Sequence, residues 1–318
     1  MYFNQDTIRD TKLIRSVLQE SGLSFLTEEI IRLPGGSKSF ALQIDNYVVR
    51  FPKSKSVYQS LRREALISKI LQKNLSTKQR CKTPEIHCYD NVSHPFSLHK
   101  TIKGKICDYI RGETEYNTRY ENLSAEQKNL LADDIADFLT ELHAIKSIVK
   151  NPLSEDWNFF QKEDFNQSAC RNALLKYSGG QIDLKNFRSD FSSSDIVFAH
   201  NDMSGSNLII NKKSPHVLRG IIDFGNAGFM PRLNEFFPYY KIHRHLARGV
   251  IEHYNHKNGG IINQTAVDYM ALGCLGYFLN KSEKQSKPPS GILLKMLENF
   301  IDDFYRSKSA ATSLPYMK

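Results

Sequence analysis

Residues 200–207 read H-N-D-M-S-G-S-N, and residues 220–225 read G-I-I-D-F-G. A short apolar run precedes the polar residues of each stretch, which is typical of a chain that leaves a strand and enters a loop. Asp202 and Asp223 are too far apart in the sequence to meet on one helix. The fold must therefore bring the two loops together if their carboxylates act at one site.

The residue types in these loops are those that phosphoryl transfer requires. One carboxylate has to orient the attacking hydroxyl and accept its proton, and hard oxygen ligands have to hold Mg²⁺ against the phosphates. In an H-x-D-x-x-x-x-N loop followed by D-F-G, Asp202 is the predicted base, and Asn207 and Asp223 are the predicted metal ligands. Either motif alone is compatible with a helix cap or an ordinary turn. Their order, with a strand pair between them, favours phosphoryl transfer.

A glycine-containing hairpin in the first part of the chain is a candidate phosphate loop. Residues 35–39 read G-G-S-K-S and connect two expected strands. Backbone N–H groups and short side chains at Gly36, Ser37 and Lys38 are suited to contact phosphates. No G-K-[ST] sequence opens a helix here, so a Walker-type loop is excluded. The same hairpin is also compatible with a plain turn.

A basic side chain on the third expected strand and an acidic one on the next helix form a candidate ion pair. Arg50 lies in the stretch V-V-R-F-P-K, and Glu64 follows inside the helix. In protein kinases a Lys–Glu pair aligns the nucleotide phosphates, and arginine offers a bidentate fork for the same purpose. Lys53 is a weaker candidate than Arg50, because it follows Pro52. The alternative for Glu64 is a solvent-facing charge.

The first hundred residues have the pattern of a sheet with one internal helix. Alternation and turn residues predict strands, and amphipathic spacing predicts helices. The expected strands are residues 25–33, 39–44, 47–51, 97–102 and 105–110, and the expected helices are 5–20 and 56–74.

The remainder is rich in helical patterns. Ser124 and Gln127 form a capping-box pattern at the start of a helix that continues to residue 145. Further helices are expected at 156–178, 232–256, 264–280 and 290–307, and short strands at 196–198, 208–210 and 218–222. The sequence thus predicts an α+β fold, with a small, mainly antiparallel β lobe over residues 1–104 and a larger helical lobe over residues 105–318.

Composition excludes several classes of protein. The 318 residues are 40% hydrophobic and 24% charged, and no run approaches the roughly 18 apolar residues that a membrane helix needs. The first residues lack the pattern of a secretory signal, and five widely spaced cysteines fit neither a disulfide framework nor a zinc site. We therefore expect a cytoplasmic protein. The 43 Lys and Arg exceed the 34 Asp and Glu, but they form no basic block, so no nucleic acid partner is expected.

In this order, the motifs resemble those of the aminoglycoside phosphotransferase family, whose fold is like that of protein kinases. Residues 47–53, 95–104 and 220–228 look most like the 2''-phosphotransferases, and the similarity spans residues 25–230. The resemblance implies a bilobal, kinase-like fold with a hinge that ends at Gly104.

The resemblance also implies roles for individual residues. The backbone of Lys100, Thr101 and Ile102 would hold the purine of ATP or GTP, with a further contact from the Thr101 side chain. His200 and Ser204 would support the catalytic loop, residues 200–207, and take no part in the chemistry. Asp202 would be the base, and Asn207 and Asp223 would be the metal ligands.

The acceptor that the resemblance implies is a hydroxyl group of an aminoglycoside, and we expect a monomeric enzyme. A polycation needs clustered carboxylates in the lobe that binds it, whereas residues 226–318 carry 12 Lys and Arg against 7 Asp and Glu. The alternative acceptor is therefore another sugar or an amino-alcohol metabolite. A non-catalytic, kinase-like module that binds nucleotide is the alternative function, since Arg50 stands where protein kinases have a lysine. The absence of an A-P-E sequence after D-F-G makes a protein substrate the weaker hypothesis.

Acidic residues of the middle third are the candidates for binding a polycation. They are Glu113, Glu115, Glu121, Glu155, Asp156, Glu163 and Asp164. The four histidines between residues 243 and 256 lack a carboxylate or cysteine at metal-ligand spacing, so we expect them on the surface.

Overall fold

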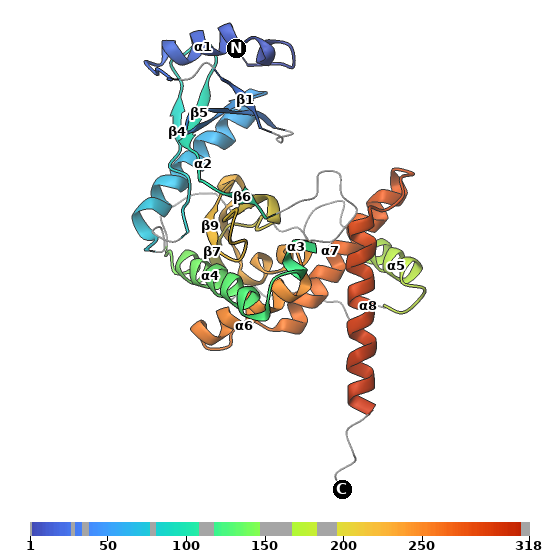
Figure 1. The fold of residues 1–318 in the computed structure, drawn as a ribbon. Helices are drawn as coiled ribbons and strands as arrows, with labels where there is room; N and C mark the ends of the chain where they lie inside the picture. Colours follow the sequence, from blue (N-terminus) through green and yellow to red (C-terminus); the bar gives the residue numbers. More distant parts are fainter. Residues whose placement is uncertain are drawn as a thin grey trace.

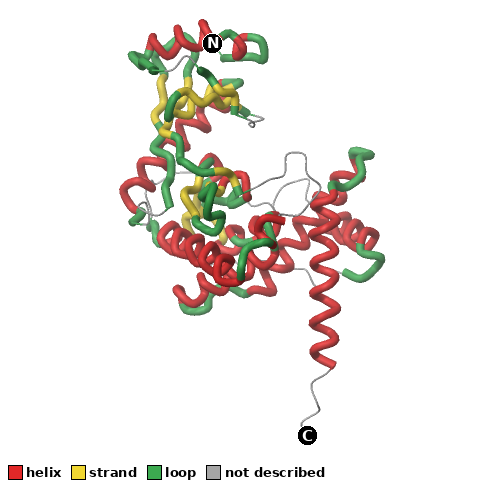
Figure 2. The backbone as a smooth tube through the Cα atoms, viewed as in Figure 1, coloured by secondary structure: helices red, strands yellow, loops and turns green. Residues whose placement is uncertain are grey.

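The chain folds into two lobes of unequal size (Figures 1 and 2). The computed structural model describes residues 2–26, 29–33, 38–76, 81–107, 118–146, 167–182 and 196–312. The N-terminal lobe is built on a five-stranded antiparallel sheet, and the C-terminal lobe is mainly helical. The bilobal α+β fold expected from the sequence is thus confirmed.

The sheet of the N-terminal lobe has the strand order β1-β2-β3-β5-β4, with antiparallel neighbours throughout. Its strands are β1 (Ile31–Arg32), β2 (Ser39–Ile44), β3 (Tyr47–Pro52), β4 (His87–Tyr89) and β5 (Phe96–Lys100). A two-residue turn at Asp45 and Asn46 joins β2 to β3, and Asp45 has a φ of +51°. This tight connection fixes the register of the two longest strands.

Helix α1 (Thr11–Glu20) covers one face of this sheet. The Asp10 carboxylate caps it by accepting the backbone N–H groups of Lys12 and Leu13, which is why the helix begins later than the expected residue 5. The apolar side of α1 shares one buried cluster with the sheet. Its members include Ile14, Val17, Leu18, Val49, Phe51 and Phe96.

Helix α2 (Lys55–Asn74) belongs to both lobes. Side chains alternate along a strand, so Arg50 points away from the face where Val49 and Phe51 pack, and α2 meets it on that other side. The C-terminal half of α2 enters the larger apolar cluster of the C-terminal lobe, through Ile67 and Leu71.

Two small sheets of the C-terminal lobe lie next to the N-terminal lobe (Figure 1). One has the order β6-β8-β9, and the other pairs β7 with β10. Their strands are β6 (Lys105–Ile106), β7 (Ile196–Ala199), β8 (Leu208–Ile210), β9 (Leu218–Ile221) and β10 (Gly228–Pro231). The chain enters the first of these sheets directly after Gly104, where a Cβ would lie 2.4 Å from the Ile209 side chain. Only glycine fits this close approach.

Helices around one continuous apolar core make up the rest of the C-terminal lobe. They are α3 (Thr118–Glu121), α4 (Ala125–His143), α5 (Gln167–Tyr177), α6 (Arg244–Asn258), α7 (Gln264–Lys284) and α8 (Gly291–Thr312). Helix α4 packs along α6, and α5 along α7. The predicted capping box of Ser124 and Gln127 is present at the start of α4. Helix α8 continues beyond the body of the lobe (Figure 1).

The structure corrects several expected elements. Residues 232–256 are not one helix: two 3₁₀ turns, Arg232–Glu235 and Phe237–Lys241, precede α6. Pro238 lies in the first positions of the second turn, and His243 caps α6. Within residues 25–33, the described strand is only β1. Strand β5 ends at Lys100 and not at residue 102. Strands β4 and β10 are not among the expected elements, because H-C-Y and G-F-M-P lack the run of three or more apolar residues that indicates β7 and β8.

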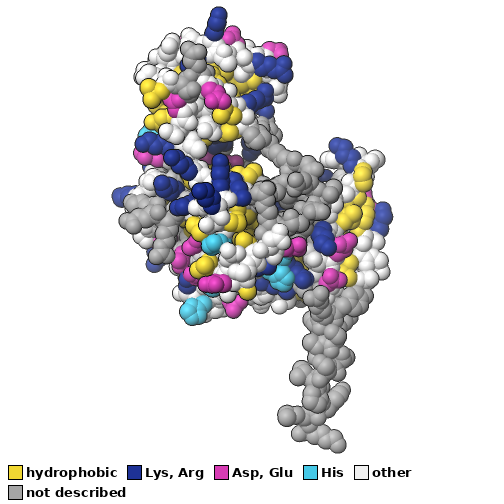
Figure 3. All heavy atoms as spheres, in the orientation of Figure 1, with side chains coloured by type: hydrophobic (Ala, Val, Ile, Leu, Met, Phe, Trp, Pro, Cys, Tyr) yellow, Lys and Arg dark blue, Asp and Glu magenta, His cyan; other side chains and the backbone are white. Residues whose placement is uncertain are grey.

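The burial of one histidine near α6 differs from the expectation that these histidines lie on the surface. His243 is only 4% exposed, so the histidines near α6 are not all on the surface. The five cysteines form no disulfide. On the face drawn in Figure 3, Lys and Arg side chains gather where the two lobes meet. No helix in the described ranges has the length and apolar character that a bilayer-spanning segment requires.

Candidate active site

His200 links the two loops singled out in the sequence. It follows β7 and is fully buried. Its Nδ1 accepts the backbone N–H of Asp202 at 3.2 Å, which assigns the ring proton to Nε2, and Nε2 donates to the Ile222 carbonyl oxygen at 2.9 Å. The ring also packs against Phe224, with centroids 4.5 Å apart. His200 thus joins the start of the catalytic loop to the strand end that carries Asp223.

A fully buried carboxylate, Glu235, holds the start of the catalytic loop. Its Oε2 accepts the backbone N–H of His200 at 2.5 Å, and its Oε1 accepts that of Asn201 at 3.2 Å. Asn201 has a φ of +62°, in a region that few non-glycine residues adopt. The two hydrogen bonds stabilise this conformation, which turns the chain so that Asp202 follows on the side of Asp223.

Asn207 closes the catalytic loop. It lies in the 3₁₀ turn Gly205–Asn207, and its Nδ2 donates to the Asp202 carbonyl oxygen at 2.8 Å. Its backbone carbonyl accepts the N–H of Ile222 at 3.0 Å. Because the amide nitrogen is occupied, Oδ1 is the side-chain atom available to a metal ion.

The two carboxylates that the sequence separates lie close enough to interact. Asp223 follows β9 in a left-handed conformation, with φ +64° and ψ +61°, and its side chain is exposed. Burial raises the pKa of Asp202 above its ordinary value, and the negative charge of Asp223 acts in the same direction. His200 and Lys241 act against this rise in the pKa of Asp202.

The donor set at these loops fits Mg²⁺. Asn207 offers an amide oxygen and Asp223 an exposed carboxylate, and both are hard oxygen donors. Across the ranges that the structure describes, no group of three or more His, Cys, Asp or Glu side chains could hold a metal ion. Two protein ligands suit an ion whose other ligands are waters and phosphate oxygens, which is usual for Mg²⁺.

Arg50 and Glu64 form the ion pair that the sequence suggested. Arg50 Nη1 lies 2.7 Å from Glu64 Oε2, and the Glu64 side chain is 2% exposed, so the solvent-facing alternative for Glu64 is wrong. Burial alone would lower the pKa of Arg50, but the carboxylates of Glu64 and Asp223 raise it overall. Arg50 therefore stays charged and lies in the electrostatic field of the predicted metal ligand.

The segment predicted to be the hinge lies between β5 and β6. The Thr101 N–H donates to the Asn46 carbonyl oxygen at 2.7 Å, so it is not available to a purine. In contrast, Thr101 Oγ1 is buried and has no hydrogen-bond partner within the described part of the chain. Gly220 of β9 lies directly against Ile102, because a Cβ there would be 2.9 Å from the Ile102 side chain.

The candidate phosphate loop lies only partly within the described residues. Gly36 and Ser37 lie outside the described residues. Lys38 is exposed directly before β2, and its carbonyl oxygen accepts the N–H of Lys53 at 3.2 Å. Ser204, assigned to loop support, hydrogen bonds through Oγ with the Ser206 hydroxyl at 2.9 Å.

Three residues at the site have no role in the sequence-based prediction. Glu235 anchors the loop, Lys241 brings a positive charge near Asp202, and Arg63 of α2 donates to the Ala227 carbonyl oxygen at 2.7 Å, just after D-F-G. Only Glu235 has a signal in the sequence, because it is the one acidic residue among residues 226–235, which follow D-F-G. Of the acidic residues considered for binding a polycation, Glu121 alone lies within the described ranges, 3.4 Å from His243.

Fold and site together define a phosphotransferase of the kinase-like class. The sequence model of the phosphotransferase enzyme family, APH, matches residues 29–266, which is most of the chain. The chain belongs to this family.

Solved structures of similar fold agree with this assignment. The ADP-bound aminoglycoside phosphotransferase APH(2'')-Ib gives a TM-score of 0.60 at 21% identity, over 92% of this chain and 97% of that one. The streptomycin–ATP–APH(2'')-IIa ternary complex gives 0.61 at 22% identity, over 92% and 96%. The macrolide 2'-phosphotransferase MphH from Brachybacterium faecium gives 0.61 at 10% identity, over 98% and 100%. At these identities the likeness concerns the fold.

Proposed function

We propose that the protein transfers the γ-phosphate of ATP or GTP to a hydroxyl group of a small molecule, with Mg²⁺ as cofactor. The observation that carries this proposal is the convergence of two loops from different strands. Asn207 is tied to the backbone of Asp202, and the charge of Asp223 acts on the Asp202 carboxylate. The predicted base and metal ligands therefore adjoin one another.

In the proposed reaction, Asp202 accepts the proton of the acceptor hydroxyl. The hydroxyl oxygen bonds to the γ-phosphorus while the bond from that phosphorus to the β,γ-bridging oxygen breaks, and nucleoside diphosphate leaves. Mg²⁺, held by Asn207 and Asp223, would offset the negative charge of the phosphates. Burial raises the pKa of Asp202, which makes it a stronger base than an exposed aspartate.

We place the nucleotide between two lobes that divide at Gly104. The division is supported by β5, which ends at Lys100, and by β6, which pairs with β8. The backbone of Lys100 and Ile102 would contact the purine, together with the Thr101 hydroxyl, which has no hydrogen-bond partner among the described residues.

The phosphates would lie toward the positively charged junction of the lobes. Arg50, held in place by Glu64, would bind them, together with the loop that contains Gly36, Ser37 and Lys38. The Lys and Arg side chains that gather at this junction (Figure 3) would attract a polyphosphate.

The acceptor class carried over from the structural neighbours is an aminoglycoside, since several of them are 2''-phosphotransferases. Another sugar or an amino alcohol is the alternative acceptor. A non-catalytic nucleotide-binding module is the alternative function, and the presence of Asp202, Asn207 and Asp223 argues against it. The monomeric state and the cytoplasmic location expected from the sequence belong to this proposal.

The test is nucleotide turnover by wild type and Asp202→Asn, with a panel of aminoglycosides and sugar alcohols. We expect Mg²⁺-dependent release of nucleoside diphosphate, lost with EDTA and restored by Mg²⁺. We expect a decrease in kcat of about 10²–10⁴-fold in the variant. Asp302→Asn, at an exposed position of α8, is the matched control. Equal turnover by wild type and Asp202→Asn would contradict the assignment of the base.

A further inference from the structure

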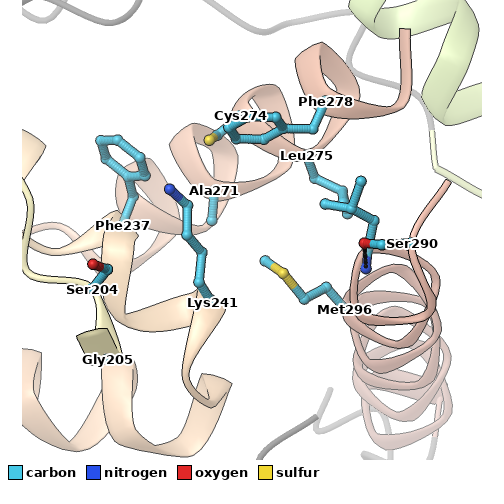
Figure 4. A pocket seen from close by; sticks show the side chains of 11 residues that line it. Ser204, Gly205, Phe237, Lys241, Ala271, Cys274, Leu275, Phe278, Ser290 and Met296 are labelled. Carbon is cyan, nitrogen blue, oxygen red and sulfur yellow. Dashed lines mark hydrogen bonds between the residues drawn. The ribbon is translucent and has the colours of Figure 1, made fainter. Parts of the chain in front are cut away.

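A pocket of about 330 Å³ opens beside the catalytic loop (Figure 4). Ser204 and Gly205, which follow Asp202 closely in the loop, form one wall, and the turn Phe237–Lys241 with helices α7 and α8 forms the others. Small-molecule sites commonly have volumes of about 300–1,000 Å³. The pocket adjoins the predicted base, so it is the place where an acceptor can present its hydroxyl to Asp202.

The lining of this pocket is apolar over most of its area. The apolar side chains come from η7 (Phe237–Lys241), α7 and α8, and they are Phe237, Ala271, Leu275, Phe278, Leu293 and Met296. Among the lining residues that the structure describes, none is Asp or Glu. A polycation that entered the pocket would lose its hydration without gaining a carboxylate from these described lining residues, which is unfavourable.

Lys241 is the one charged side chain among these lining residues. Its Nζ lies 5.3 Å from the centroid of the Phe278 ring. In Figure 4 the side chain extends from η7 toward Phe237 and α7, along the pocket. Its charge also acts on Asp202. An ammonium group in apolar surroundings attracts an anion and repels a cation.

We infer that this pocket binds the acceptor through an apolar face and pairs an anionic group of the acceptor with Lys241, so that Lys241 determines specificity against cationic acceptors. The inference rests on the proposed phosphotransferase function and replaces the acceptor class carried over from the structural neighbours. The expected acceptor is a hydroxylated molecule with an apolar ring or chain and a carboxylate, sulfate or phosphate group.

Three fluorescent probes of similar apolar character test this inference. They are anilinonaphthalene sulfonate, an anion; N-phenyl-1-naphthylamine, which has the same frame without the sulfonate; and dansylcadaverine, a cation. We expect the anion to bind most tightly and the cation most weakly. Lys241→Met should weaken binding of the sulfonate about tenfold and leave the neutral probe unchanged.

Two further variants control the experiment. Lys281→Met removes another lysine that lies over an aromatic ring, Tyr277 at 5.9 Å, but does not line the pocket, and it should bind all three probes as wild type does. Leu293→Trp narrows the pocket from its partly exposed rim and should weaken both the sulfonate and the neutral probe. Its thermal unfolding, compared with wild type, shows whether the fold is retained.

The outcomes separate this inference from the proposed function. Suppose that Mg²⁺–ATP binds and is hydrolysed while neither Lys241→Met nor Leu293→Trp changes the affinity for the probes. In that case the inference is wrong and the proposed function stands. Efficient phosphorylation of kanamycin that Lys241→Met leaves unchanged would also overturn it. If neither ATP nor GTP binds, the proposed function fails, whatever the probes show.

Discussion

Glu235 and His200, 35 residues apart in the sequence, are joined by a hydrogen bond of 2.5 Å between the buried carboxylate and the backbone N–H that opens the catalytic loop. The second oxygen of Glu235 accepts the N–H of Asn201. One side chain thus fixes both the start of the loop and the left-handed residue within it. The position of Asp202 depends on this anchor as well as on the His200 ring.

Replacing Glu235 with Gln should slow catalysis. The amide nitrogen cannot accept a hydrogen bond, so one backbone N–H is left buried without a partner, at a cost of about 1–3 kcal/mol. We expect a decrease in kcat and little change in the KM for nucleotide. The reason is that the substitution displaces the predicted base, Asp202, and leaves the predicted purine-binding segment in place. Steady-state kinetics check this, with the exposed Glu252→Gln as control and Glu235→Asp as a partial rescue. A variant with unchanged kcat would show that the anchor is dispensable.

The Arg50–Glu64 pair should be strongly coupled. Glu64→Gln leaves a mostly buried guanidinium without its counter-charge, and breaking such a pair costs about 3 kcal/mol. We expect a lower free energy of unfolding and a higher KM for nucleotide. A double-mutant cycle with Arg50→Met and Glu64→Leu measures the coupling by urea unfolding. Additive effects of the two single variants would contradict the coupling.

Gly220→Ala should disturb the hinge. The added Cβ would lie 2.5 Å from the Lys82 carbonyl oxygen and 2.9 Å from the Ile102 side chain, so backbone has to move, at a cost of about 1–3 kcal/mol. We expect weaker binding of a fluorescent ATP analogue. Gly259→Ala is the control, because it strains the end of α6 at φ +76° without a clash. If both variants lost nucleotide affinity to a comparable extent, the loss in Gly220→Ala would follow from reduced stability of the fold and not from a change at Ile102.

His243 should make the protein sensitive to acid. Burial, followed by the positive charges of His245, Arg244 and Lys128, lowers the pKa of His243 to about 3. Glu121, at 3.4 Å, is half exposed and too well solvated to reverse this. The unfolded chain therefore binds a proton that the folded chain does not between pH 6.5 and 3. Stability should decrease as pH falls through this window, by up to about 1.4 kcal/mol per pH unit.

The variant His243→Asn checks this pH dependence. In the folded protein His243 Nδ1 accepts the N–H of His245 as the cap of α6, and asparagine can provide the same cap without titrating in this range. Thermal unfolding between pH 7 and 4 should show a steeper loss of stability for wild type than for the variant. Parallel curves would show that another group governs the acid response.

Local patterns explain what the sequence could predict. The capping box at Ser124, the hairpin of β2 and β3, and the loops around Asp202 and Asp223 each depend on neighbours a few residues away. The Arg50–Glu64 pair followed from one strand and the next helix. The functional roles of Asp202, Asp223 and the Arg50–Glu64 pair stay a prediction, with which the geometry is compatible.

Long-range contacts explain what the sequence could not predict. Glu235 is one of several polar residues in an irregular turn, and its partners are backbone groups from another strand. Lys241 has no local signal at all, because the pocket it lines is assembled from the catalytic loop, α7 and α8. His243 is buried by packing against Tyr120 and His245, which no periodicity near residue 243 reveals.

Because α2 packs against both lobes, the N-terminal lobe cannot be exchanged between relatives as an independent unit. Arg63 of α2 donates a hydrogen bond to the Ala227 carbonyl oxygen, just after D-F-G, and Ile67 and Leu71 are buried in the core of the C-terminal lobe. A chimaera that grafts residues 1–104 onto a relative would import a helix with foreign contacts along half its length. Exchange of modules between members of the family should succeed only when the residues facing α2 are exchanged with it.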